Sequence, residues 1–307
     1  MSEDKKFIRF MSARKLAAVL SLLAVTASLL LIAFKGLNFG LDFTGGTLIE
    51  VAYEEAIPLE EVRDSLAREG YDNAVVVNFG SDTDVLVRLP VGLSPELGEQ
   101  VLAVLRNDSP SGVELQRIEF VGPQVGEELR EQGGLAVLLA LAVVLVYVAM
   151  RFQMKFAYGA VLALAHDVII TLGVFALVGW DFDLTVLAAV LAVIGYSLND
   201  SIVVADRIRE NLRGMRGYTP IDIINISLTD TLGRTLVTSG TTLLVLIALA
   251  TVGGEMIHSF ALALLVGVGV GTYSSVFIVA SLLVAMNISP EDLMVPEKEG
   301  AELDDLP

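Results

Sequence analysis

Long apolar runs separated by short polar connections make up most of this sequence. A helix needs about 20 apolar residues to cross a hydrocarbon core roughly 30 Å thick. Runs that reach or approach this length cover residues 16–34, 134–150, 156–180, 184–206, 235–253 and 259–286. The pattern predicts an α-helical polytopic membrane protein with six transmembrane helices. The first run is expected to be a retained anchor, because no convincing cleavage site follows it.

Composition supports a membrane protein and narrows its partners. Hydrophobic residues make up 54% of the chain and charged residues only 19%, against about 25% charged in soluble domains. The net charge is −17, and segment 36–132 holds 19 acidic against 6 basic residues. Nucleic acid is therefore not an expected partner. The absence of cysteine excludes disulfides and thiolate catalysis.

Basic residues fall in alternate connections, which sets the expected orientation. Short loops rich in Lys and Arg stay on the cytoplasmic side. Such residues precede the first run and fill the second-to-third and fourth-to-fifth connections, at Lys5, Lys6, Arg9, Arg14, Lys15, Arg151, Lys155, Arg207, Arg209, Arg213, Arg216 and Arg234. The connections 179–183 and 253–259 contain none. Both termini are expected in the cytoplasm, and the large segment after the first run is expected outside the membrane.

The expected organisation places one domain between the first two spans. It comprises a cytoplasmic N-terminus (1–15), transmembrane helix 1 (16–35), an extracytoplasmic domain (36–132), transmembrane helices 2–6 (133–287) and an acidic cytoplasmic tail (288–307). A cytoplasmic connector, 207–233, is amphipathic, and its apolar face is expected to lie along the membrane surface. That face comprises Ile221, Ile224, Leu228 and Leu232.

Within the extracytoplasmic domain, periodicity and turn residues predict two strand–helix–strand units. The expected strands are 47–53, 73–80, 84–91 and 113–122, and the expected helices are 58–70 and 94–108. This order is typical of an α+β ferredoxin-like fold, a fold that by itself names no function. The segment holds no paired catalytic carboxylates and no phosphate loop, so an interaction or substrate-contacting module is favoured.

Asp200 and its neighbour Asn199 lie well inside the fourth run. An ionisable side chain at that depth costs roughly 3 kcal/mol or more, and so marks a functional site by default. The fifth run carries a stripe of hydroxyls with a basic residue, Arg234, before it. These hydroxyls recur at helical spacing at Thr235, Thr238, Ser239 and Thr242. Arg234 either reaches lipid phosphate or leans inward to Asp200.

Two further polar or small-residue groups lie inside the predicted spans. His166 and Asp167 stand near the middle of the third run, where they either relay protons or lock the bundle through hydrogen bonds. Gly267, Gly271 and Ser275 recur every four residues in the sixth run. Small residues at this spacing allow close helix packing, and a sliding role is the alternative.

These motifs together resemble the SecD/SecF protein-export family, and within it the smaller SecF subunits. The resemblance rests on GLNFGLDFTGGT (36–47), VGPQVGEEL (121–129), ALAHDV (163–168), SLNDSIVVADRIREN (197–211), TLGRTLVTSGTT (231–242) and GVGTYSSVFIV (269–279). It implies half of a twelve-span RND-type unit in the plasma (inner) membrane. The implied partners are a SecD-like six-span subunit, the SecYEG channel, YajC and YidC, emerging preproteins and membrane lipid.

The resemblance also implies a mechanism. In that family, residues at the positions of Asp200 and Arg234 form a proton path together with an Asp of SecD, and Asn199 and the hydroxyl stripe share that neighbourhood. The leading hypothesis is an auxiliary of preprotein export that uses the proton gradient. The alternatives are a half-exporter of lipid or small amphiphiles and a passive translocon assembly factor. No enzymatic activity, metal or cofactor is expected, and the proton is the coupling ion.

Overall fold

The computed structural model describes residues 7–89, 97–108, 112–289 and 292. Within this part of the chain, six helices are long and apolar enough to cross a membrane. They are α1 (Arg14–Phe34), α5 (Pro123–Arg151), α6 (Met154–Val178), α7 (Leu184–Gly214), α8 (Pro220–Val252) and α9 (Glu255–Ala285). The predicted polytopic architecture is confirmed. Lys5 and Lys6, used for the expected orientation, and most of the acidic tail lie outside the described residues.

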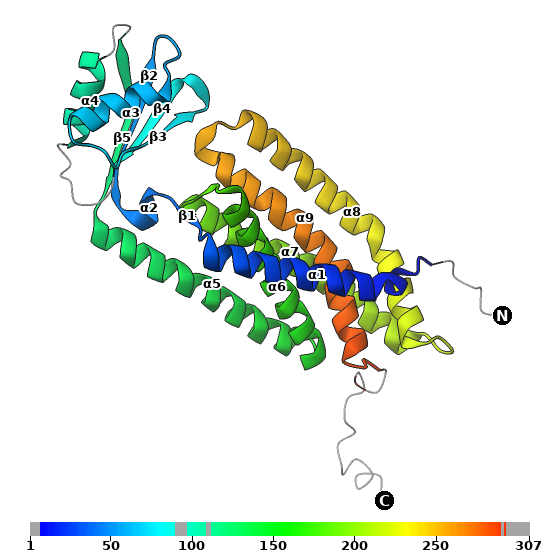
Figure 1. Cartoon of the computed structure of the whole chain (residues 1–307). Helices are drawn as coiled ribbons and strands as arrows, with labels where there is room; N and C mark the ends of the chain where they lie inside the picture. The colour runs from blue at the N-terminus through cyan, green and yellow to red at the C-terminus, as the bar shows by residue number, and fades with distance from the viewer. Residues whose placement is uncertain (1–6, 90–96, 109–111, 290–291, 293–307) are drawn as a thin grey trace, which may run out of the picture.

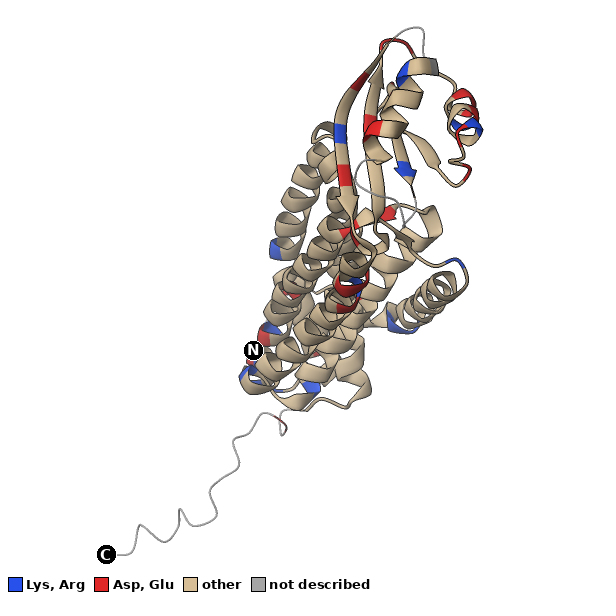
Figure 2. Ribbon diagram, turned by 90° about the vertical axis from the view of Figure 1, so that its left-hand side faces the viewer, with Lys and Arg blue, Asp and Glu red and all other residues tan. Residues whose placement is uncertain are grey.

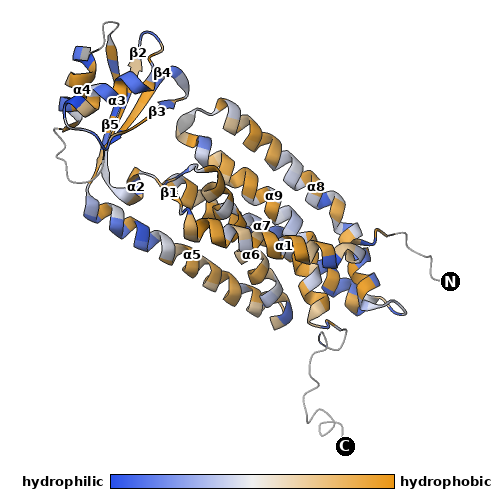
Figure 3. Cartoon of the chain, in the orientation of Figure 1, coloured by the Kyte–Doolittle hydropathy of each residue, from blue (hydrophilic) through white to orange (hydrophobic). Residues whose placement is uncertain are grey.

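Three helices form the centre of the bundle and three form its edges. The apolar stretches of α6, α7 and α9 are the most buried, whereas those of α1, α5 and α8 are mostly exposed. Figure 1 shows α5 and α8 on opposite sides of the bundle, and Figure 3 shows apolar residues over most of its length. The edge helices are therefore the surfaces available to lipid or to partner proteins.

Local capping, rather than hydropathy, sets where several of these helices begin. The side chain of Asp183 caps α7 by accepting from the Val186 N–H at 2.8 Å, and Thr219 caps α8 by accepting from the Asp222 N–H at 3.2 Å. α5 begins with Pro123 in its first turn. Residues 123–132, expected in the extracytoplasmic domain, thus form the polar first turns of α5 (Figure 3).

The connector 207–233 is not a separate surface element. Residues 207–214 continue α7, and residues 220–233 begin α8. Arg207 pairs with Asp230 at 2.6 Å, and Asn211 donates to Ser227 at 2.9 Å. The expectation that the apolar face lies on the membrane is wrong for its central residues, because Ile224 and Leu228 are buried in the protein core. These side chains contact the rest of the protein, and not lipid, because α7 and α8 pack against each other here.

The domain between α1 and α5 is a four-stranded antiparallel sheet with two helices on one face. Its elements are β2 (Gly46–Tyr53), α3 (Leu59–Arg68), β3 (Val75–Phe79), β4 (Ser81–Leu89), α4 (Leu97–Asp108) and β5 (Val113–Val121). The strand order β3-β4-β2-β5 is that of a ferredoxin-like fold. The core lies between sheet and helices and includes Ile49, Val51, Val87, Leu66 and Val101. The predicted α+β fold is confirmed.

A small junction joins the domain to the bundle. β1 (Asn38–Phe39) pairs in parallel with β6 (Asp181–Phe182), which immediately precedes α7. The short helix α2 (Leu41–Thr44) follows β1, and its Asp42 accepts from the Leu184 N–H at 3.0 Å. Arg88 of β4 forms an ion pair with Asp181 at 2.8 Å. These contacts link the start of α7 to the sheet domain through α2 and the β1–β6 pair, which lie between them (Figure 1).

Candidate intramembrane polar site

The polar residues of the spans lie between two apolar clusters. One cluster, near the sheet domain, includes Phe43, Phe175 and Val190. The other, at the far end of the bundle, includes Phe156, Ile208 and Ile224. Residues 196–201 of α7 fall between the two, so the polar groups are sealed at both ends by packed side chains. Figure 2 shows how sparse charged residues are along the bundle, most of whose ribbon is uncharged.

Asp200 is buried and weakly held. The residue is only 4% exposed, and Ser239 of α8 donates to its Oδ2 at 3.5 Å. A distance of 3.5 Å is at the outer limit of a hydrogen bond. Among the described residues, no ion pair involves this carboxylate. Asp200 therefore lacks the short hydrogen bonds that usually accompany a buried carboxylate, as far as the described residues go.

Ser239 is the centre of a small hydroxyl cluster around Asp200. Thr272 of α9 donates to Ser239 Oγ at 2.8 Å, and Tyr196 of α7 donates to the same oxygen at 3.4 Å. Ser239 itself is buried. The cluster therefore brings hydroxyls of three helices to one carboxylate. Thr272 was not singled out from the sequence, because it lies in a small-residue string that was interpreted as packing.

The predicted hydroxyl stripe of α8 divides between two faces. Thr235 and Ser239 are buried, whereas Thr238 is exposed and Thr242 half-buried. Thr238 donates to the Arg234 carbonyl at 3.0 Å, and Thr242 donates to the Thr238 carbonyl at 2.8 Å. These two hydroxyls are thus bound to their own helix, whereas Ser239 contacts side chains of α7 and α9.

Arg234 and Asn199 lie outside the buried cluster. Arg234 is exposed, and no ion pair joins it to Asp200 within the described chain. It stands five residues before Ser239, roughly 7.5 Å along the helix. Asn199 is also exposed, on an α7 face that includes Ala192 and Gly195 at helical spacing. The structure therefore does not place either residue in contact with Asp200.

Asp167 is held much more firmly than Asp200. It is fully buried, and Ser197 of α7 and Ser274 of α9 donate to its Oδ2 at 2.6 Å and 2.7 Å. Its Oδ1 lies 2.9 Å from His166 Nδ1. The acid therefore joins α6, α7 and α9 at one point. Neither serine was predicted as its partner, since they lie 30 and 107 residues away.

His166 lies beside Asp167 and lines a groove on the surface of the bundle. It is 7% exposed, its ring stacks on that of Tyr273, and its Nε2 has no hydrogen-bond partner among the described residues. The Tyr273 hydroxyl donates to the Ala17 carbonyl at 3.0 Å, which adds α1 to the group. His166 and Tyr273 line an apolar groove of about 340 Å³ between α1, α6 and α9.

The small residues of α9 lie where α7 approaches most closely. A Cβ on Gly267 would overlap the side chain of Val193, and one on Gly271 would lie 3.0 Å from Ser197 Cβ. Ser275 is buried, and its hydroxyl donates to the Thr272 carbonyl at 3.0 Å. The close packing lets α7 and α9 serve both acids, since Ser197 and Ser274 bind Asp167 while Tyr196 and Thr272 reach Ser239.

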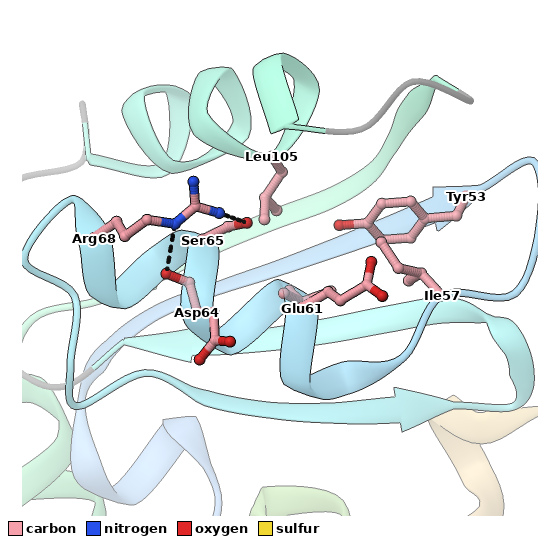
Figure 4. Close-up of a pocket in the computed structure, with 8 residues that line it drawn as sticks. Tyr53, Ile57, Glu61, Asp64, Ser65, Arg68 and Leu105 are labelled. Carbon is pink, nitrogen blue, oxygen red and sulfur yellow. Dashed lines mark hydrogen bonds between the residues drawn. The ribbon is translucent and has the colours of Figure 1, made fainter.

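The sheet domain has a hollow of its own, away from the intramembrane groups. It measures about 190 Å³ and lies between α3, α4 and β2 (Figure 4). Tyr53 forms part of its wall, and burial raises the pKa of this phenol to about 12. Arg68 donates to Ser65 Oγ at 2.9 Å beside it. In the described residues, no group of three His, Asp or Glu side chains is arranged to hold a metal ion.

Comparison with known proteins places this arrangement in a family. The family model "Protein export membrane protein SecD/SecF, C-terminal" matches residues 100–289, and the "SecD/SecF GG Motif" model matches residues 30–57. The chain belongs to the SecD/SecF family. In the GG motif, Gly45 and Gly46 have φ of 67° and 123°, and a Cβ on Gly46 would overlap the Leu89 carbonyl.

Relatives within the SecD/SecF family match the chain along nearly its whole length. The protein translocase subunit SecF of Vibrio alginolyticus is 53% identical over 99% of this chain and 98% of its own, and that of Pseudomonas aeruginosa is 50% identical over 98% of each. SecDF from Thermus thermophilus, a translocon-associated membrane protein, superposes with a TM-score of 0.84 at 38% identity. That match covers 94% of this chain but 40% of the solved one.

A second SecDF structure, in a form described as super-membrane-facing, gives a TM-score of 0.69 at 39% identity with the same coverage. The chain thus spans less than half of these SecDF chains while it spans almost all of the separate SecF relatives.

Proposed function

We propose that this chain serves in protein export as a SecF subunit. The near full-length similarity to SecF subunits of protein translocases supports this role. The 40% share of the SecDF chains supports a SecD-like six-span partner that supplies the remainder of a larger unit. The other proposed partners are the SecYEG channel, YajC, YidC, membrane lipid and emerging preprotein, with no nucleic acid and no enzymatic activity of its own.

The proposed energy source is the proton gradient, and Asp200 is the proposed proton carrier. The observation that carries this proposal is the contrast between the two buried acids. Asp167 accepts two short hydrogen bonds from serines, whereas Asp200 accepts one hydrogen bond, at 3.5 Å, from the part of the chain that the structure describes. An acid that is poorly held in its charged form can gain a proton without breaking a network. Protonation would then change how α7 and α8 pack.

Arg234 is proposed to pair with the charged form of Asp200 in another arrangement of α8. The guanidinium is exposed and about 7.5 Å along the helix from Ser239, a separation that a long side chain and a modest shift of α8 can close. Pairing would stabilise the carboxylate, and protonation would release the arginine. The buried hydroxyls of Thr235 and Ser239 are proposed to form the inner part of the proton path. Thr238 and Thr242, which are more exposed, are proposed to form its outer part.

The exposed face of α7 is the proposed contact with the SecD-like partner. Ala192, Gly195 and Asn199 lie on this face at i, i+3 and i+7. An amide at this depth is costly against lipid, and small residues allow close helix approach. A partner helix on this face would satisfy Asn199 and approach the Asp200 region from the side opposite α9.

One helix, α7, connects Asp200 to the junction with the sheet domain. α7 begins at the β1–β6 junction, where Asp42 accepts from Leu184 and Arg88 pairs with Asp181. A tilt or rotation of α7 would therefore move the sheet. The domain is proposed to face the extracytoplasmic side and to contact preprotein through edge strand β3, whose Val75 and Val77 are exposed. The termini are proposed to face the cytoplasm, and the membrane is proposed to be the plasma (inner) membrane.

An Asp200→Asn substitution tests the coupling. We expect the variant complex to fold and to assemble, because a neutral amide replaces a weakly held acid. Preprotein translocation into membrane vesicles should lose its response to the proton gradient, measured with and without an ionophore. Asp206→Asn is the matched control, because Asp206 lies on the same helix and is exposed; it should respond as the wild type does.

The remaining outcomes separate the competing functions. A normal gradient response in the Asp200→Asn complex would refute coupling through this residue and favour a passive assembly role. Photocrosslinking from Val77 separates export of protein from export of amphiphiles. Capture of emerging preprotein supports the proposed function, whereas capture of lipid or small amphiphiles alone favours a half-exporter.

A further inference from the structure

A basic groove lies at the end of the bundle farthest from the sheet domain. It measures about 680 Å³ and separates the start of α1 from the first turns of α8. Among the described residues, its lining includes three cations, Arg9, Arg14 and Lys15, and one acid, Asp222. Within the described part of the chain, none of the three cations forms an ion pair. The groove therefore holds excess positive charge without a counterion from the described residues.

The one acid of the groove is already engaged. The hydroxyl of Thr219 donates to Asp222 Oδ2 at 2.6 Å, and the Asp222 N–H donates back to Thr219 at 3.2 Å. This reciprocal pair caps α8. The carboxylate of Asp222 still offsets one of the three positive charges, so the lining keeps an excess of two. The first turn of the 33-residue helix α8 adds partial positive charge to the same wall.

The groove has a fixed shape because the segment before α1, residues 8–13, is hydrogen-bonded to α8. The Met11 N–H donates to Asn225 Oδ1 at 2.9 Å, and the Ile8 N–H donates to Thr229 Oγ1 at 3.0 Å. Phe10 packs edge-on against Phe277 of α9. These contacts hold the 3-10 turn η1 (Phe10–Ala13) beside α8, so Arg9 before the turn and Arg14 and Lys15 after it line one preformed hollow.

An apolar surface begins directly beyond the cations. Lys15, Val19 and Leu22 share one face of α1 at i, i+4 and i+7. Val19 is 54% exposed and Leu22 is 67% exposed. The face therefore passes from positive charge to exposed hydrocarbon within about 10 Å. A ligand that matches it carries an anionic group followed by an apolar chain.

We propose that this groove binds the phosphate group of an anionic phospholipid, with an acyl chain against the Lys15–Leu22 face of α1. The unpaired cations recognise the phosphate, and the exposed apolar side chains distinguish a lipid from a soluble anion. A lipid bound here would hold residues 8–13, and through them α8, at a defined depth in the membrane. The site does not depend on the proposed role of Asp200.

The test titrates the purified full chain, in uncharged detergent, with phosphatidylglycerol and with phosphatidylcholine, and follows bound lipid by native mass spectrometry. Arg9→Gln, Arg14→Gln and Lys15→Gln should each weaken phosphatidylglycerol binding about fivefold, and the triple variant on the order of a hundredfold. The matched control is a triple variant at the same end of the bundle, Arg151→Gln, Arg209→Gln and Arg216→Gln, which should bind as the wild type does.

Asp222→Asn adds a test in the opposite direction. It removes the acid that lines the groove and keeps an amide that can still accept from Thr219, so phosphatidylglycerol should bind a few-fold more tightly. Equal phosphatidylglycerol binding by the wild type and the basic-groove triple variant would overturn the proposal. An equal loss in the control triple variant would reduce the effect to general surface charge and would also overturn it. Displacement of the lipid by an equal concentration of inorganic phosphate would assign the site to a soluble anion instead.

Discussion

At the scale of single residues, two acids of the same type have opposite surroundings. Asp167 receives hydroxyl donors from two other helices and contacts His166, whereas Asp200 accepts one long hydrogen bond among the described residues. A buried carboxylate with several short hydrogen bonds stabilises the packing of the elements that supply them. This difference favours a structural role for Asp167 and agrees with the proposed role of Asp200 as proton carrier, although the sequence offers both as relays.

Substitutions at Asp167 should separate the two roles. Asp167→Leu removes the carboxylate that accepts from both Ser197 and Ser274, and we expect it to lower the free energy of unfolding by about 3 kcal/mol. Asp167→Asn keeps one acceptor oxygen and should retain both the fold and the gradient response. Thermal unfolding in detergent and the vesicle assay measure these effects. A loss of gradient response in Asp167→Asn as complete as that in Asp200→Asn would instead favour a relay through His166.

At the scale of elements, the contact between α7 and α9 determines the geometry of the site. Gly267 and Gly271 of α9 lie against Val193 and Ser197 of α7. This approach places Thr272 and Ser274 of α9 on opposite sides of the contact, one toward Ser239 and the other toward Asp167. The small residues allow α7 and α9 to lie close together. The hydroxyl hydrogen bonds to Ser239 and Asp167 depend on this short separation.

A pair of glycine substitutions tests this contact. Gly267→Ala adds a methyl that overlaps Val193, so we expect it to destabilise the bundle by about 1–3 kcal/mol. Gly269→Ala is the control, since a Cβ there meets nothing within 4 Å and Ala favours a helix by up to about 1 kcal/mol. Thermal unfolding of both variants should rank Gly267→Ala below the wild type and Gly269→Ala at or above it. The reverse order would contradict close packing at Gly267.

At the scale of the whole molecule, a small junction links the sheet domain to the start of α7. The β1–β6 pair, the Asp42–Leu184 hydrogen bond and the Arg88–Asp181 ion pair all converge just before α7. Figure 1 shows the domain beyond the end of the bundle, with α2 and the start of α5 beneath it. A change in α7 therefore reaches the domain through this junction.

Removing the ion pair should loosen this junction and leave the two parts folded. The chain contains no cysteine, so labels introduced at the exposed positions Val75 and Ala188 report the domain-to-bundle distance without background. Arg88→Gln should broaden the distance distribution measured by electron paramagnetic resonance. Arg63→Gln, which removes the Arg63–Glu60 pair inside the domain, should not. Identical distributions for wild type and Arg88→Gln would show that the pair does not hold the domain.

The sequence by itself determined the spans, the strand and helix order of the sheet domain, and the presence of acids inside the membrane. Each of these depends on local composition or periodicity, since about 20 consecutive residues decide whether a helix is stable in lipid. Tertiary structure alone decided that the α8 hydroxyls divide between two faces, that the 207–233 connector is buried, and that Asp167 and Asp200 differ. Those outcomes depend on how helices rotate against each other, and the partners involved are as far apart as Asp167 and Ser274.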